Sequence, residues 1–386
     1  MKEKLVIQNF GPIRDIELNN IQRFLILIGE SGSGKSTILK VLSLCRWIYK
    51  QQNIRAYLHN ANVTRSPFRH NINGYLNTSG LLEYVKKGSL IKYERDGVSI
   101  CIEGELQKRA KLTVTEPAIP QLCWEKVCFI AEKRNTLPDL IATRTSEKYA
   151  GYYVMELFRE FKRAQEYIKE MKLSSVDVRF RLEKKNGNEK WKIENLVENA
   201  ETFSIDFEDA SSGIQSSAPV DMLLNYFSQY YDIVSAMNTS VVEYLGASDS
   251  LKNFRPDINV GEVQNRCVDL MIEEPEMCLF PNNQIRFISS LIQHTFADNS
   301  AFVIRTAITT HSPYILNYMN LLFKAYDKGQ KINEVNLSYD DIDVYAVKNG
   351  GVLNLKVKNA HLVNPEYLAQ PIDEIYDMYE LLNKKD

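Results

Sequence analysis

The sequence has few of the features that mark a secreted or membrane protein. Its six cysteines are scattered, and none forms a C-x-x-C pair or stands at zinc-ligand spacing with a histidine. No apolar run reaches the roughly 18 residues that a membrane-spanning helix needs. The N-terminal residues predict a strand rather than a signal peptide. We therefore expect a cytoplasmic protein without a membrane partner, whose thiols are reduced. The cysteines are Cys45, Cys101, Cys123, Cys128, Cys267 and Cys278.

The chain also lacks a strong charge of either sign, internal repeats and low-complexity linkers. Its formal net charge is −2, which argues neither for nor against a nucleic-acid partner. Hydrophobic residues make up 44% and charged residues 25%, as is ordinary for a globular protein. A length of 386 residues fits one large α/β domain with an inserted subdomain.

A phosphate-binding loop is the most informative motif in the chain. Residues 29–37 read GESGSGKST, follow the apolar run 24–28, and precede a helix predicted from Lys35 to about Tyr49. Glycines let the backbone wrap a phosphate at the strand-to-helix turn, and the helix N-terminus favours the anion. The alternative is a chance glycine-rich turn, which the matching strand, loop and helix disfavour. The predicted ATP-binding residues are Gly29, Ser31, Gly32, Ser33, Gly34, Lys35, Ser36 and Thr37.

Within this loop two side chains have predicted roles. Lys35 would reach the β- and γ-phosphates, and the Ser36 hydroxyl would ligate Mg²⁺. A second motif, the apolar strand 268–272, ends in acids. Glu273 is expected to hold Mg²⁺, and Glu274 to orient and deprotonate the attacking water. The alternative is a solvated acidic turn, but three acids at the end of a buried strand need a cation nearby.

Two further motifs stand in the same order along the chain. His311, in the segment THSP after the predicted strand 301–309, can donate to the γ-phosphate and sense its presence. A surface or N-cap histidine is the alternative. The segment SSGIQSS at 211–217 is by itself only a polar turn before a helix, although such a helix N-terminus can bind an anion.

The remaining pattern alternates strands and helices. The periodic helix expected from Ser146 to Leu173 either faces the core, which is favoured, or forms an arm for a partner. Expected strands cover 4–9, 15–20, a hairpin at 90–103 with its turn at Asp96-Gly97, 126–130, several within 176–207, 344–347 and 352–355; expected helices cover 220–245, 282–296 and 373–383. Residues 1–50 and 205–386 would form the nucleotide-binding core of a single 1–386 head, with 136–204 as an inserted helical and strand subdomain.

The series GESGSGKST, SSGIQ, IEEPEMCLFP and TTHSP resembles the motifs of ABC-type ATPases. The resemblance is closest to the soluble branch with RecF, SMC-like proteins and the overcoming-lysogenization-defect (OLD) ATPases, and it covers about 1–50 and 205–320. The opening residues 7–13 resemble the N-terminal strand and turn of that branch. It implies an α/β fold, an ABC-type P-loop ATPase head with a mixed, largely parallel sheet. It also implies ATP and Mg²⁺ as cofactors.

The resemblance further implies that ATP lies between two copies of the chain. Ser212, Gly213 and Gln215 fall on the signature motif that completes the ATP site of the opposite subunit, with Ser211 and Ile214 departing from its pattern. Residues 279–281 fall on a segment that contacts the partner in such dimers. Glu132 and Arg134 are candidates for the Q-loop, and a salt-bridged surface role is equally open for them.

The tail predicts no second catalytic domain. Asp340, Asp341 and Asp343 could suggest a metal site, but the roughly 75 residues after His311 leave no room for a TOPRIM nuclease of the OLD type, and an acidic turn is favoured. Any nuclease would come from another protein.

Two functions remain in view. One is the sensor or scaffold ATPase of an anti-phage defence system, triggered by a phage protein and controlling a separate nuclease or toxin subunit, because the chain resembles ATPase subunits of systems such as PARIS and Septu. The other is a RecF-like DNA-binding ATPase of repair or recombination, which predicts steeply salt-dependent DNA binding. A transporter ATPase is disfavoured.

Overall fold

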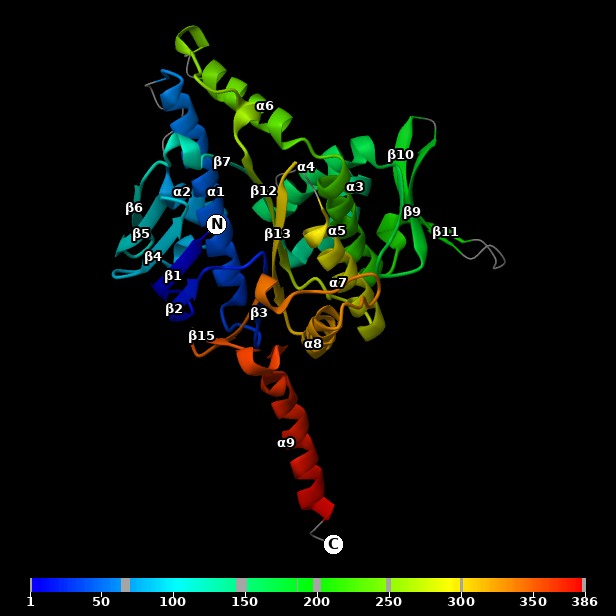
Figure 1. Ribbon diagram of the computed structural model, residues 1–386. Helices are drawn as coiled ribbons and strands as arrows, with labels where there is room; N and C mark the ends of the chain where they lie inside the picture. The colour runs from blue at the N-terminus through cyan, green and yellow to red at the C-terminus, as the bar shows by residue number, and fades with distance from the viewer. Residues whose placement is uncertain are drawn as a thin grey trace.

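The computed structural model describes residues 2–63, 70–143, 151–185, 187–196, 203–247, 251–298 and 301–383. Over these residues, four sheets and the helices packed on them make up an α/β structure, as predicted (Figure 1). The six-stranded central sheet has the order β15-β14-β3-β13-β12-β7. Its strands are β3 (Phe24–Ile28), β7 (Cys123–Ile130), β12 (Asn265–Glu273), β13 (Val303–Thr310), β14 (Ile342–Lys348) and β15 (Gly351–Asn354).

The central sheet is buried on both faces. All its neighbouring pairs are parallel except β14–β15, which is antiparallel. Every residue of β3 is fully buried, and its side chains alternate between two apolar clusters: Phe24 and Ile26 belong to one, and Leu25 and Leu27 to the other. A continuous apolar run such as FLILI is the pattern that a parallel strand covered on both sides requires.

An antiparallel sheet of order β2-β1-β4-β5-β6 lies on one side of this core. Helix α1 contacts β5 of that sheet and β7, β12 and β13 of the central one, so it lies between them. The strands are β1 (Glu3–Phe10), β2 (Ile13–Asn19), β4 (Leu90–Arg95), β5 (Val98–Leu106) and β6 (Arg109–Val114).

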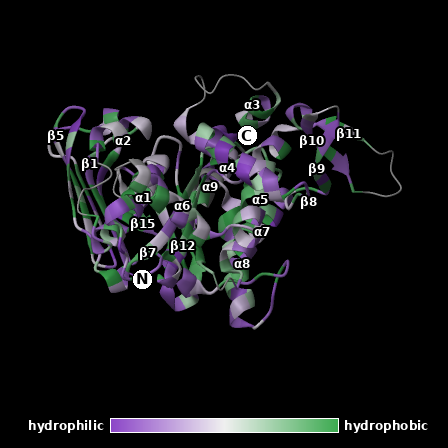
Figure 2. Ribbon diagram, turned by 90° about the horizontal axis from the view of Figure 1, so that it is seen from above, coloured by the Kyte–Doolittle hydropathy of each residue, from purple (hydrophilic) through white to green (hydrophobic). Residues whose placement is uncertain are grey.

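The opposite side carries helices and a small antiparallel sheet of order β11-β10-β9-β8, whose outer strands are largely hydrophilic in Figure 2. The strands of this sheet and the short β16–β17 pair are β8 (Glu170–Lys172), β9 (Val178–Lys185), β10 (Asn188–Asn195), β11 (Ser204–Asp206), β16 (Lys356–Val357) and β17 (Leu362–Val363). The helices are α1 (Lys35–Asn60), α2 (Ile72–Thr78), α3 (Leu137–Thr143), α4 (Tyr152–Tyr167), α5 (Ser212–Gln229), α6 (Ile233–Ala247), α7 (Pro281–Phe296), α8 (Pro313–Asp327) and α9 (Glu366–Asn383). That residues 136–204 form an inserted subdomain stays a prediction.

The helix predicted over 220–245 is wrong in its bounds. The structure has two helices there, because α5 already begins at Ser212 and ends at Gln229. The Asp232 carboxylate then accepts hydrogen bonds from the backbone N–H groups of Val234 (2.9 Å) and Ser235 (3.1 Å), which caps a new helix. Pro219 lies inside α5 without ending it.

Three other boundaries differ from the sequence expectations. Helix α1 continues past Tyr49 to Asn60, and α9 begins at Glu366 rather than near 373. The helix expected from Ser146 is observed over α4 only; residues 146–150 lie outside the described residues, and 170–172 form strand β8. Among the described residues, no helix is both long and apolar enough to cross a membrane.

The acidic tail segment is only partly the turn that we expected. Asp340 and Asp341 are exposed in a short 3₁₀ turn. Asp343, by contrast, lies buried at the start of β14, where its carboxylate accepts a hydrogen bond from the Gln22 backbone N–H at 2.9 Å. Asp343 therefore holds β14 against the chain that enters β3.

Candidate nucleotide site

The parallel register brings the predicted motifs to one edge of the central sheet. Thr310 of β13 pairs with Ile28 of β3, and Glu273 of β12 pairs with Thr309 of β13. The three strands therefore end together, and the chain leaves β3 into the phosphate-binding loop, β12 into the acidic segment and β13 into His311. The crevice beyond the carboxyl ends of parallel strands is where α/β sheets bind ligands.

Glycines shape the loop between β3 and α1. Gly32 and Gly34 have φ angles of 78° and 108°, which side chains rarely adopt. A Cβ atom on Gly34 would lie 2.6 Å from the Cδ1 atom of Ile13, so this position also has no room for a side chain. Gly34 precedes the first residue of α1, and the free N–H groups of that helix end point into the loop.

Lys35 and Ser33 fit a phosphate ligand. The Lys35 ammonium donates to the carbonyl oxygens of Gly29 and Glu30, both at 2.8 Å, so it is already folded back over the loop. Burial lowers the pKa of Lys35, and the carboxylates of Glu274 and Glu276 oppose that shift. The Ser33 hydroxyl is buried without a hydrogen-bond partner among the described residues. An orphaned donor and a desolvated cation are what a bound anion would satisfy.

Glu273 has the surroundings of a metal-binding carboxylate. It is buried at the end of β12, and one of its oxygens accepts the Glu132 backbone N–H at 3.2 Å. The Lys40 ammonium lies 3.9 Å from the other oxygen. Burial raises the pKa of Glu273, and the charge of Lys40 and a hydrogen bond from Ser36 oppose that change. The two predicted Mg²⁺ ligands, Ser36 and Glu273, are thus in contact.

Glu274 and His311 form a pair at the mouth of the site. The His311 Nε2 atom lies 3.2 Å from the Glu274 Oε1 atom, and each side chain is about one-third exposed (35% and 32%). This hydrogen bond is the main reason that the pKa of Glu274 is lowered. Glu274 also has a φ of 43°, a strained conformation for a residue with a side chain. Its backbone N–H is held by the Thr309 carbonyl at 3.0 Å.

Glu276 is a site residue for which the sequence suggested no role. It is partly buried, and its Oε1 atom accepts hydrogen bonds from the Thr310 hydroxyl and the His311 backbone N–H, both at 2.7 Å. Burial raises the pKa of this carboxyl. Glu276 therefore joins the chain after β12 to the chain after β13 and sets the position of His311. The sequence signal that could have identified Glu276 is its place shortly after the two candidate site acids, Glu273 and Glu274.

Arg134 is buried, so the salt-bridged surface role that we left open for it is wrong. Its guanidinium donates to the carbonyl oxygens of Glu273 (2.6 Å), Glu274, Ala131 (3.2 Å) and Ser216 (2.9 Å). Burial lowers its pKa to about 10. Arg134 thereby ties the end of β12, where the two acids lie, to helix α5. Glu132 contributes its backbone N–H to Glu273, whereas its side chain is exposed.

We expect Arg134→Lys to slow turnover more than it weakens nucleotide binding. A lysine keeps the charge but cannot hold four carbonyl groups in a fixed plane, so the backbone of Glu274 would shift. Misplacing a reacting group by about 1 Å costs roughly 10²-fold in rate. Steady-state hydrolysis, separated into kcat and KM, would show this as a fall in kcat. Arg286→Lys, at an exposed pair with Asp177, is the control. A change confined to KM would contradict the positioning role.

The predicted signature residues lie at the start of α5. Ser212 is exposed at the first residue of the helix, and the Gln215 amide donates to the Glu208 carbonyl at 2.7 Å. Gly213 packs against the loop after β12, because a Cβ atom on it would lie 2.8 Å from the Cys278 carbonyl oxygen. The same loop ends in Phe280, whose side chain is 70% exposed. The start of α5 and the loop after β12 are therefore neighbours at one surface.

Comparison with known proteins gives likenesses to ATPase head structures. No protein-family model matches the chain, and no curated protein matches it in sequence. The SMC head domain from Thermotoga maritima aligns over 92% of this chain and 99% of its own, with 11% identity and a TM-score of 0.39. The recombination mediator protein RecF aligns over 92% and 98%, with 10% identity and a TM-score of 0.38. The dimeric ATP-binding cassette MJ0796, bound to ADP and phosphate, aligns over 90% and 96%, with 12% identity and a TM-score of 0.33. Because these TM-scores lie below 0.5, the chemistry of the site is inferred from its own residues.

Proposed function

We propose that the protein is an ATP-binding and ATP-hydrolysing switch that closes as a dimer around ATP. The observation that carries this proposal is the meeting of Lys35, Glu273 and the Glu274–His311 pair at one edge of the central sheet. A phosphate-binding loop, a buried metal-type carboxylate and an exposed carboxylate beside a histidine are the parts that phosphoryl transfer to water uses.

In this proposal each side chain has one task. Lys35 leaves the carbonyl groups of its own loop and binds the terminal phosphates. Ser36 and Glu273 would hold Mg²⁺, which neutralises charge that develops on the phosphate oxygens. Glu274 orients the attacking water and accepts its proton, and His311 donates to the γ-phosphate.

The second half of the site would come from a second copy of the chain. Ser212 is exposed at a helix N-terminus, where it can meet an anion on another molecule. The exposed Phe280 side chain lies on the neighbouring loop and offers an apolar contact beside it. Closing the two copies then depends on the γ-phosphate, and hydrolysis releases them.

The test is Mg²⁺-dependent ATP hydrolysis together with the native mass of the purified chain, with and without ATP. We expect hydrolysis and an ATP-dependent shift toward twice the chain mass. Lys35→Ala should lose both, because the terminal phosphates lose their cation. If the wild-type protein neither binds nor hydrolyses ATP while properly folded, the proposal is wrong.

The proposed output is control of a separate protein subunit, which docks on α9. This helix projects away from the body of the protein (Figure 1). Six large apolar side chains on it are each more than 60% exposed, and the acids Glu374, Asp377 and Glu380 lie among them. Clustered exposed apolar side chains of this kind mark interaction sites, so a covering partner is expected. The apolar residues are Ile375, Tyr376, Met378, Tyr379, Leu381 and Leu382.

The acids among these apolar side chains favour a partner whose apolar groove is bordered by lysine or arginine. The sequence resemblance to ATPase subunits of anti-phage systems supports a nuclease or toxin subunit as that partner, with the ATPase as its sensor or scaffold. A RecF-like role on DNA is the alternative, and it would require a basic surface that binds DNA.

Co-expression with the neighbouring genes tests the output. In the presence of ATP and Mg²⁺, we expect the native mass to reveal an ATPase dimer or larger assembly with a stoichiometric effector subunit. The double variant Tyr376→Ser, Tyr379→Ser should lose that subunit but keep ATP hydrolysis. If instead it separates two copies of this chain, the occupant of α9 is a second copy. A bare dimer that recovers only DNA would favour the repair function.

A further inference from the structure

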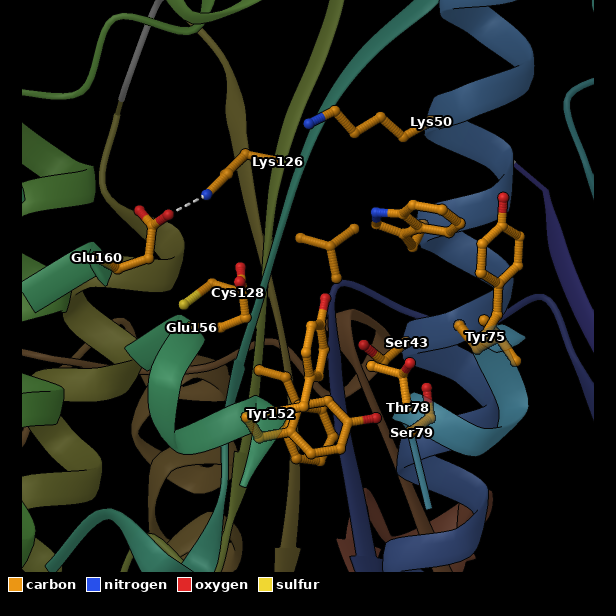
Figure 3. Close-up of a pocket in the computed structure, with 15 residues that line it drawn as sticks. Ser43, Lys50, Tyr75, Thr78, Ser79, Lys126, Cys128, Tyr152, Glu156 and Glu160 are labelled. Carbon is orange, nitrogen blue, oxygen red and sulfur yellow. Dashed lines mark hydrogen bonds and ion pairs between the residues drawn. The ribbon is translucent and has the colours of Figure 1, made fainter. Parts of the chain in front are cut away.

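A cavity of about 340 Å³ lies between α1, α2, β7 and α4 (Figure 3). Its walls come from four segments far apart in the sequence, and it is large enough for a small organic ligand. Ser43 and Lys50 enter it from α1, Tyr75 and Thr78 from α2, and Lys126 from β7. The steps proposed above for ATP use none of these residues.

One wall of the cavity is aromatic. The rings of Trp47 and Tyr75 meet edge to face with centroids 4.6 Å apart. Tyr153 also lines the cavity, with its ring centroid 4.2 Å from that of Phe129 and 5.4 Å from that of Tyr152. Such aromatic side chains favour a flat, apolar ring as ligand, because a ring stacks on them with a large contact area.

The other end of the cavity is charged, and its charges are not all paired. Lys126 lies 2.6 Å from Glu160, which Arg163 also contacts at 2.7 Å. Glu156 pairs with Arg159. Lys50 has neither a hydrogen bond nor an ion pair with any residue that the structure describes, although Figure 3 shows it reaching toward Lys126 inside the cavity. Burial, with the charge of Lys126, lowers the pKa of Lys50 to about 8.

Lys50 is partly buried, and its ammonium group lines the cavity without an ion-pair partner in the described part of the chain. A ligand anion in the cavity could form a charge-assisted hydrogen bond with it. Glu160 adds a second requirement, because its Oε2 atom is buried without a partner among the described residues and can accept a hydrogen bond. We propose that this cavity binds a small aromatic anion, with its ring between Trp47, Tyr75 and Tyr153 and its acid group at Lys50.

The cavity is also joined to the nucleotide site. Lys40 lies over the Tyr153 ring, 5.8 Å from its centroid, and 3.9 Å from Glu273. We therefore expect a ring bound against Tyr153 to shift the Lys40 ammonium, which lies beside the Glu273 carboxylate. The ligand is thus expected to act as an effector, and this second step rests on the proposed ATPase function.

Binding is tested on nucleotide-free protein with two fluorescent probes that differ in charge. The sulfonate is 8-anilinonaphthalene-1-sulfonate, and the neutral analogue is N-phenyl-1-naphthylamine. We expect Lys50→Met to weaken the sulfonate about tenfold or more and to leave the neutral probe nearly unchanged, because a hydrogen bond to a charged group contributes about 1.5–3 kcal/mol. Lys111→Met, at an exposed lysine on β6, is the matched control and should change neither.

A second variant locates the probes. Thr78 is exposed at the end of α2 and lines the cavity, so Thr78→Phe would fill it without disturbing the core. We expect this variant to weaken both probes. Equal sulfonate affinity in wild type and Lys50→Met, or unchanged affinities in Thr78→Phe, would overturn the proposed site. These results do not depend on whether the protein hydrolyses ATP.

The effector step has its own readout. Affinity for ATP is measured with and without the sulfonate in wild type and in Lys50→Met. Because coupling between two sites is reciprocal, we expect the sulfonate to change ATP affinity in wild type and not in the variant. The same ATP affinity with and without the sulfonate in wild type would overturn the effector step.

Discussion

Glu274→Gln is expected to bind ATP normally, to slow its hydrolysis about 10²–10⁴-fold, and to hold the protein as a dimer. An amide keeps the size and most of the hydrogen bonding of the side chain but cannot accept the proton of the attacking water. Glu274 is also the partner of His311 at 3.2 Å, and Gln can still accept a hydrogen bond from that ring. Binding should therefore survive while turnover stops.

The measurement combines single-turnover hydrolysis with native mass in the presence of Mg²⁺ and ATP. The variant should elute as a dimer that persists, whereas wild type should return to the monomer as ATP is consumed. Glu103→Gln, at an exposed residue of β5, controls for loss of one surface charge. Hydrolysis at the wild-type rate would show that Glu274 is not the general base.

Arg305→Met is expected to destabilise the fold by about 3–5 kcal/mol, because it breaks a buried ionic network. The Arg305 guanidinium contacts Asp269 at 2.7 Å, Glu3 at 2.9 Å and Glu125 at 3.1 Å. Arg46 also binds Glu3 (2.8 Å) and Asp269 (3.1 Å). Without Arg305, the buried carboxylates of Glu3 and Asp269 would share a single arginine, Arg46, and the lost charge would not be replaced by water.

Acid titration should reveal the same loss. Burial alone would raise the pKa of Glu3, but the charges of Arg46 and Arg305 outweigh it and lower that pKa to about 2. A carboxyl whose pKa is lowered on folding stabilises the protein above its unfolded pKa and loses this contribution as the pH falls toward 2. In Arg305→Met the pKa of Glu3 rises, so acid unfolding should begin at a higher pH.

Urea unfolding at neutral pH and acid unfolding measure both effects. Arg286→Met, which removes an exposed ion pair with Asp177 (2.8 Å), is the control and should cost less than about 1 kcal/mol. The expectation fails if Arg305→Met unfolds with the same free energy as that control.

The sequence predicted those site residues that belong to short local motifs. The glycines and Lys35 of the loop, the acids after β12 and His311 after β13 each follow an apolar strand, and parallel pairing brings the three strand ends together. Because both faces of the central sheet are buried, its strands read as apolar runs that are easy to recognise. The α/β fold was predictable for the same reason.

The contacts across the fold could not be predicted in this way. Asp269 lies within a strand that reads as apolar, and it is tolerated there only because Arg46 and Arg305 reach it from α1 and β13. Arg134 likewise gained its role from carbonyl groups of Glu273 and Ser216, which are distant in sequence. Such pairings depend on tertiary packing, which the hydrophobic periodicity of a single segment does not reveal.

Some predicted helix boundaries were wrong, although local signals in the sequence could have corrected part of them. Asp232 followed by a helical pattern is a cap signal, and it divides the stretch that we expected to be one helix. Pro219 favoured a start after it, yet α5 begins earlier, at Ser212. That earlier start places the predicted signature residues at a helix N-terminus.

The most direct measurement mixes two inactive variants, Lys35→Ala and Ser212→Arg, under nucleotide-free conditions and then adds ATP and Mg²⁺. If each ATP site combines the loop of one copy with the signature of the other, a hybrid dimer has one intact site. We then expect hydrolysis to recover to about a quarter of wild type, since half of the dimers are hybrids with one of two sites working. Ser99→Arg, at an exposed serine of β5, should remain active alone. A mixture as inactive as its two folded components would contradict the shared site.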